Sequence, residues 1–136
     1  MGTGNSGKFK STSGSLKPEH LMEELRNSGV KFTEEDVIAI TKQANGKIVW
    51  LERGNIEVGL EHIVYEHGED FNKIGIQKNK IPHFIIKAVT DGKVVGKQGK
   101  YNNKPRIVYE LEYEGEIKKV AISIGANGFI VGANPR

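Results

Sequence analysis

Residues 106–113 read Arg-Ile-Val-Tyr-Glu-Leu-Glu-Tyr, and this stretch decides the fold class because its side chains alternate with a period of two. Such alternation is typical of a strand with one face in the core. The pattern predicts that Ile107, Tyr109, Leu111 and Tyr113 point inward, with Arg106, Val108, Glu110 and Glu112 on the other face.

Three further strands are predicted around this one. Residues 93–98 precede it after an Asp-Gly turn, and residues 117–124 follow it after Glu114-Gly115. Asn127-Gly128, the strongest hairpin signal in the chain, separates residues 117–124 from a closing strand at 129–131. We therefore expect an antiparallel sheet of about four strands at the C-terminal end.

The first half reads mainly as helix. Four helices are expected, beginning at Pro18, Thr33, Ile56 and Ile81. Thr33 would be the N-cap of a pattern that resembles a capping box, and Pro82 would lie in the first turn of the last helix. The third helix ends near His67 and is followed by a further turn to Ile76. A short buried strand is expected at 48–51, with Trp50 as a core residue rather than a base-stacking platform. Helices followed by strands predict an α+β fold.

The domain organisation is predicted from composition. Residues 1–15 are rich in Gly, Ser and Thr and read as a flexible linker, which leads us to expect the tail of a longer protein. Residues 16–136 form one domain, with a helical subregion at 16–46 and a catalytic core at 47–136. The chain has no cysteine, and no run of eighteen apolar residues predicts a membrane span.

The charge is segregated along the sequence. Residues 18–72 carry five Lys or Arg against twelve Asp or Glu, whereas residues 73–106 carry nine against one. A basic block suits a phosphate backbone. The alternative is that the two blocks neutralise each other in the fold.

Two of the four histidines, His62 and His67, lie in the segment 59–71. Histidine titrates near neutrality, so the two are candidates for a general base and a general acid. Residues five apart on a helix point about 140° away from each other, which argues against a shared metal ion. One imidazole would lie in a cleft and the other at the helix end near Gly68. Structural roles for both histidines are the alternative.

These residues could together cleave RNA without a metal or another cofactor. A base would take the proton of a ribose 2′-OH, an acid would protonate the leaving oxygen, and a cation would stabilise the charged transition state. Tyr109 and Ser123 are polar strand residues that could orient the phosphate. The candidate cations are Lys93, Lys97, Lys100, Lys104 and Arg106.

Three stretches carry a resemblance to a known family: 50–55 (WLERGN), 59–71 (GLEHIVYEHGEDF) and 127–136 (NGFIVGANPR). The chain resembles the C-terminal ribonuclease toxin domains of bacterial polymorphic and contact-dependent inhibition toxins. The resemblance implies a barnase/EndoU/RelE-like fold, with helices packed on an antiparallel sheet. Matched by position, His62 and His67 are the motif histidines, and Tyr109 and Ser123 stand at polar strand positions. Glu66 occupies a position that is basic in many relatives, so the cation would come from Arg106 or the lysines.

The same resemblance implies an activity and a setting. Such domains cleave RNA, often tRNA, are delivered into the cytoplasm of a competing cell at the end of a secreted or surface protein, and are blocked by a cognate immunity protein. Some need a host translation factor. The alternatives are a nucleic-acid-binding module without catalysis and a protein-interaction module.

Overall fold

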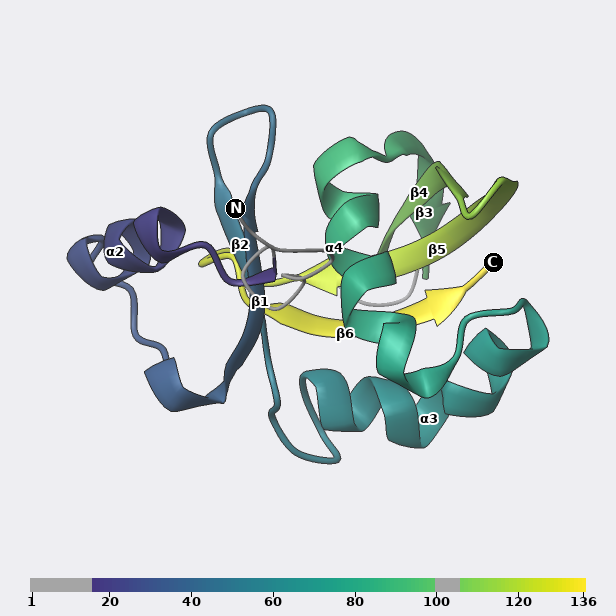
Figure 1. The fold of residues 1–136 in the computed structure, drawn as a ribbon, viewed down its shortest axis with the longest axis horizontal. Helices are drawn as coiled ribbons and strands as arrows, with labels where there is room; N and C mark the ends of the chain where they lie inside the picture. The colour runs from purple at the N-terminus through teal and green to yellow at the C-terminus, as the bar shows by residue number, and fades with distance from the viewer. Residues whose placement is uncertain (1–15, 100–105) are drawn as a thin grey trace, which may run out of the picture.

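The computed structural model describes residues 16–99 and 106–136, which form helices packed against an antiparallel sheet (Figure 1). The α+β class predicted from the sequence is confirmed. In chain order the elements are α2 (Glu19–Asn27), the 3-10 turn η2 (Glu34–Asp36), β1 (Val37–Lys42), β2 (Ile48–Glu52), α3 (Leu60–Lys73), the 3-10 turn η3 (Lys78–Lys80), α4 (Ile81–Asp91), β3 (Lys93–Gln98), β4 (Arg106–Tyr113), β5 (Glu116–Ile124) and β6 (Ile130–Pro135).

The four C-terminal strands form one antiparallel sheet in the order β3-β4-β5-β6. The predicted hairpin at Asn127-Gly128 joins β5 to β6. Gly128 has a φ of 106°, and a Cβ there would lie 2.2 Å from the carbonyl oxygen of Ile48. Glycine at this turn therefore allows the sheet to meet β2, where the amide of Trp50 donates to the carbonyl of Gly128 at 3.0 Å.

The prediction of a helix after Thr33 is wrong beyond Asp36. Residues 37–42 form β1, which pairs with β2 across a turn at Gly46. The run Val-Ile-Ala-Ile-Thr is rich in β-branched residues, which favour strands, and pairing with a buried neighbour outweighs the capping pattern. The expected helical subregion 16–46 therefore contains a strand.

The small β1–β2 sheet separates two parts of the core. On one side, Leu21, Met22 and Leu25 of α2 pack with Ile40 and Trp50. On the other side, Ala39, Val49 and Leu51 are fully buried in the main core beneath α4. Trp50 is fully buried, as predicted, and its indole Nε1 donates to Glu52 Oε2 at 2.9 Å.

Helix α3 begins later and ends later than predicted. The loop before it contains Gly54 and Gly59, both at positive φ, and the Asn55 side chain accepts hydrogen bonds from the amides of Glu57 and Val58. The amide of Gly59 donates to the carbonyl of Val131 on β6 at 2.9 Å, which fixes the helix start beside that strand. Since α3 continues unbroken to Lys73, His67 and Gly68 lie within the helix and not at its end.

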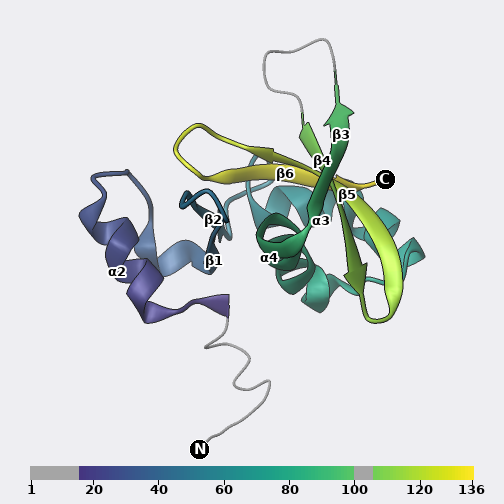
Figure 2. The same ribbon diagram turned by 90° about the horizontal axis from the view of Figure 1, so that it is seen from above.

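The two faces of the four-stranded sheet differ in what covers them. Helix α4 covers one side of the sheet and α3 runs along its β6 edge (Figure 2); this core face carries Ile107, Tyr109, Leu111, Ile122 and Ala133. Among the described residues, no helix lies over the opposite face. We call this second surface the open face; its side chains come from residues 96, 98, 106, 108, 110, 112, 117, 119, 121, 123, 132 and 134, which alternate with the core residues. No helix of the described chain is long and apolar enough to cross a membrane.

Candidate functional site

A row of four residues crosses the open face from β3 to β6. Gln98 pairs with Arg106, and Ser123 pairs with Gly132. The regular β4–β5 register, in which Ile107 lies opposite Ile122, places Arg106 beside Ser123. Asn134 lies two residues beyond Gly132 on β6 and therefore on the same face.

Arg106 is held in this row by a neutral group. Its Nη1 donates to Oδ1 of Asn134 at 2.6 Å. Among the residues that the structure describes, no carboxylate forms an ion pair with Arg106. The side chain is half-buried, and desolvation lowers the pKa of Arg106 below its usual value, although a guanidinium stays charged at neutral pH. The open face thus carries a partly desolvated positive charge that is available to an anion.

His62 reaches the same place from the first turn of α3. Its Nδ1 lies 2.9 Å from the carbonyl oxygen of Ile56. A carbonyl only accepts, so Nδ1 carries the proton and Nε2 is left as the basic nitrogen. The preceding loop, shaped by its glycines, supplies this carbonyl and therefore selects the tautomer.

Gly132 is the point where His62 and Arg106 approach each other. A Cβ at residue 132 would lie 2.7 Å from Nη2 of Arg106 and 3.4 Å from Cδ2 of His62. Of the His62 ring atoms, Cδ2, which is bonded to Nε2, is the one nearest to this position. The absence of a side chain at Gly132 allows a base and a cation to stand next to one another.

Ser123 lies in the same row but is engaged with the backbone. Its Oγ donates to the carbonyl of Gly132 at 3.3 Å, across the β5–β6 pair. The structure therefore brings together three of the predicted site residues, His62, Arg106 and Ser123.

His67 is placed apart from this row. It lies on α3 about 140° around the helix from His62. Its Nδ1 contacts Oδ2 of Asp70 at 2.9 Å, and its side chain is 28% exposed. This contact orients the imidazole of His67 through Nδ1.

Tyr109 lies on the core face, opposite to Arg106 and Ser123. It is 5% exposed, and its hydroxyl accepts a hydrogen bond from Nε2 of Gln43 at 3.5 Å. Burial raises the pKa of Tyr109 above its usual value of 10. The structure thus separates Tyr109 from the other predicted site residues and places it in the packing beneath α4.

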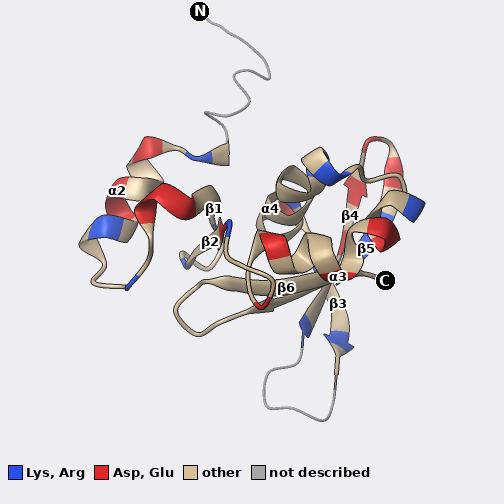
Figure 3. Ribbon diagram, turned by 90° about the horizontal axis from the view of Figure 1, so that it is seen from below, with Lys and Arg blue, Asp and Glu red and all other residues tan. Residues whose placement is uncertain are grey.

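The predicted phosphate-binding lysines are divided. Lys93 and Lys97 are exposed on β3, and Lys97 pairs in register with Ile107, so it projects from the face opposite to Arg106. Figure 3 shows positive charge at the end of β3 and the start of β4. Lys100 and Lys104 lie outside the described residues.

Part of the basic block is neutralised locally, by carboxylates that do not belong to the acidic block 18–72. Lys80 contacts Glu114 at 3.5 Å, and Lys87 contacts Asp91 at 3.7 Å.

Sequence reasoning assigned no role to Gln98, Gly132 or Asn134. Gly132 and Asn134 stand in the segment 127–136 that carries the family resemblance. Counting outward from the Asn127-Gly128 hairpin would have set both opposite β5, two residues apart on one face. Gln98, the last residue of β3, could be placed only with the β3–β4 register.

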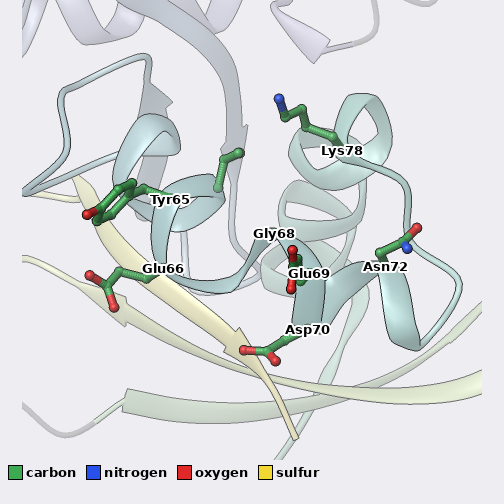
Figure 4. A pocket seen from close by; sticks show the side chains of 8 residues that line it. Tyr65, Glu66, Gly68, Glu69, Asp70, Asn72 and Lys78 are labelled. Atoms are coloured by element: carbon green, nitrogen blue, oxygen red, sulfur yellow. The ribbon is translucent and has the colours of Figure 1, made fainter.

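Hollows in the described part of the chain lie away from the open face, and two of them exceed 500 Å³. One, of about 540 Å³, lies along the outer side of α3, where Glu66, Glu69 and Asp70 project and Lys78 stands across from them (Figure 4). The other, of about 610 Å³, is lined by Lys80, His83, Lys87, Tyr113 and Glu114, among other residues. Within residues 16–99 and 106–136, no three His, Asp or Glu side chains are grouped as a metal site would require.

The comparisons with known proteins add nothing to this geometry. No protein-family model matches the chain, and no curated protein matches it either. The open face itself combines a histidine of fixed tautomer with a cation that can bind a phosphate.

Proposed function

We propose that this chain is a metal-independent endoribonuclease whose site is the open face of the sheet. One observation carries the proposal: Arg106, which no described carboxylate neutralises, and the ring of His62 both lie against Gly132. A general base next to a phosphate-binding cation is the minimum that cleavage at a ribose 2′-OH needs.

In the proposed reaction, Nε2 of His62 takes the proton of the 2′-OH. The 2′-oxygen then bonds to the adjacent phosphorus, the bond from phosphorus to the 5′-oxygen breaks, and a 2′,3′-cyclic phosphate forms. Arg106 stabilises the negative charge that develops on the phosphoryl oxygens. The leaving 5′-oxygen takes its proton from water, because His67, the acid expected from the sequence, lies about 140° around α3 from His62 and apart from this row.

The test is incubation of the purified full chain with total bacterial RNA in excess EDTA. We expect the wild-type chain to cut the RNA, and His62→Ala and Arg106→Ala to lose most of this activity while remaining folded by circular dichroism. His20→Ala is the matched control because His20 is exposed on α2, and it should cut at the wild-type rate. Intact RNA with the wild-type chain would contradict the proposal.

The family resemblance extends the proposal to a setting. The substrate would be tRNA, and the chain would act in the cytoplasm of a competing cell, opposed by a cognate immunity protein and in some cases assisted by a host translation factor. Expression in a bacterium should arrest growth and degrade tRNA, and co-expression of the neighbouring gene should prevent both. Normal growth with abundant folded protein would contradict this setting.

An RNA-binding module without catalysis would use the same Arg106. Such a module would retain RNA on a gel, bind more weakly as salt rises, and leave the RNA intact. Substitution of His62 would then change nothing.

A further inference from the structure

Two side-chain amides on the open face form a closed pair. Nε2 of Gln98 donates to Oδ1 of Asn134 at 2.9 Å, and Nδ2 of Asn134 donates back to Oε1 of Gln98 at 3.3 Å. The same Oδ1 accepts the bond from Nη1 of Arg106. A guanidinium can only donate, so this contact determines which way the Asn134 amide faces. Gln98 therefore orients Asn134, and Asn134 orients Arg106.

The geometry also separates the two ends of the guanidinium. Nη1 is bound to Asn134, whereas Nη2 is the nitrogen that lies near Gly132 and His62. Rotation of the Arg106 side chain away from His62 would break the bond to Asn134. The amide thus keeps one edge of the guanidinium turned toward the base.

Among the residues that the structure describes, Asn134 differs chemically from the partners of the cations that form ion pairs. Arg26, Lys42, Lys80, Lys87 and Lys118 all contact carboxylates. A carboxylate at residue 134 could hold the guanidinium equally well, but it would cancel the charge and occupy the donors that a phosphate needs. An amide oxygen supplies orientation and leaves the net positive charge in place.

We infer that Asn134, fixed by Gln98, is a positioning residue that directs Arg106 at His62 without neutralising it and so reserves the site for a phosphodiester anion. This inference rests on the function proposed above. Asn134 touches neither the reacting phosphate nor the 2′-OH, and its contribution passes through Arg106.

The decisive variant is Asn134→Asp, which preserves the shape and replaces the neutral partner with a carboxylate. We expect it to weaken binding of a single-stranded deoxyoligonucleotide, which lacks the reactive 2′-OH, at least tenfold at fixed salt. RNA cleavage should fall by a similar or larger factor, with a raised KM, and the thermal midpoint should not decrease. Asn79→Asp, the same change at an exposed residue of η3, should leave both measurements unchanged.

Asn134→Ala and Gln98→Ala supply tests that introduce no charge. Because Arg106 remains cationic but loses its orientation, kcat should fall by about tenfold or more, while KM and deoxyoligonucleotide affinity change little. A purely structural role for the amide pair would instead lower the thermal midpoint without this split between kcat and KM.

The outcomes separate the positioning role from the nuclease proposal. If wild type cuts RNA and folded Asn134→Asp binds and cuts equally well, the positioning role is wrong and the nuclease proposal survives. If wild type cuts nothing but Asn134→Asp still loses deoxyoligonucleotide affinity relative to Asn79→Asp, the positioning role stands and the nuclease proposal fails. If the Asp variant does not fold, Asn134→Ala with wild-type kcat overturns the inference.

Discussion

The α2 flank and the open face of the sheet each hold an arginine, and they hold it in opposite ways. On the flank, Arg26 contacts Glu19 at 2.7 Å and Glu34 at 2.6 Å, and the pKa of both carboxyls is lowered, chiefly by hydrogen bonds from Arg26. On the open face, Arg106 is half-buried and contacts only an amide among the described side chains. A guanidinium with two carboxylates is satisfied locally, whereas one with a neutral partner keeps its charge for a ligand.

The difference shows what distinguishes a candidate site from surface charge. Ion pairs such as those of Arg26 are exposed and screened, and they contribute little beyond local order. A partly desolvated charge without a counter-ion is unfavourable unless a ligand uses it. Because His62 lies next to Arg106, an anion bound there would also have a general base beside it.

The largest effect is expected at the base that faces Arg106. His62→Ala removes the proton acceptor and should lower the rate of RNA cleavage by about 10²–10⁴-fold, the usual contribution of a general base. Initial rates on a labelled tRNA, with His20→Ala in parallel, measure this. Equal cleavage rates for the two variants would show that His62 is not the general base.

The second-largest effect on RNA cleavage is expected for the cation, Arg106. Arg106→Ala should lower kcat by about 10²–10³-fold, the cost of losing a donor to developing charge. Arg106→Lys should recover only part of this, because an ammonium cannot contact Asn134 and a phosphate with the same fork geometry. Full activity of the lysine variant would show that charge alone suffices and that the orientation by Asn134 is irrelevant.

A smaller loss is expected when the gap between His62 and Arg106 is filled. In Gly132→Ala the new Cβ would lie 2.7 Å from Nη2 of Arg106, so the flexible end of the arginine must shift. We expect a several-fold decrease in kcat with nearly unchanged thermal stability. Unfolding of the variant would instead assign Gly132 to packing.

The core face provides a contrast that pH can test. Burial raises the pKa of Tyr113 to about 12, above the usual value of 10. A phenol whose folded-state pKa is raised contributes stability that is complete below about pH 10 and declines as pH rises toward 12, because only the unfolded chain ionises in that window. Urea midpoints measured from pH 8 to 12 should fall, and Tyr113→Phe should flatten the fall.

The smallest effect is expected on the α2 flank. Arg26→Ala should leave RNA cleavage unchanged, since Arg26 is far from the open face in the fold and already paired. It should reduce acid sensitivity: the lowered carboxyl pKa values of Glu19 and Glu34 contribute stability that is present above about pH 4.5 and lost as pH falls. A loss of RNA cleavage comparable to that of Arg106→Ala would contradict the prediction that only the arginine of the open face serves the reaction.

Much of the fold could be predicted from local patterns. Alternation in β4 and the turn chemistry at Asn127-Gly128 give the sheet, its order and its two faces. The error at residues 37–42 arose because a capping pattern and an apolar spacing fit a helix, while the deciding interaction is pairing with β2, nine or more residues away for most of the strand. Periodicity within one segment does not report such pairing.

The site could be predicted only in part, for a related reason. His62 and Arg106 were candidates by residue type. Their proximity, however, depends on the hydrogen bond from the amide of Gly59 to the carbonyl of Val131 and on the lack of a side chain at Gly132. Tyr109 was a candidate because it is polar, although its own alternation with Arg106 already placed it on the core face. No sequence motif marks Asn134, because its role comes from contacts with Gln98 of β3 and Arg106 of β4 on the open face.

The measurement that tests the central claim most directly is the chemistry of the new RNA ends. Full-length chain and tRNA are incubated in EDTA, and the fragments are analysed for terminal phosphate. We expect a 2′,3′-cyclic phosphate on every upstream fragment and a 5′-hydroxyl on every downstream one, absent with His62→Ala and present with His20→Ala. Fragments that carry a 5′-phosphate, or no fragments from folded wild-type chain, would contradict it.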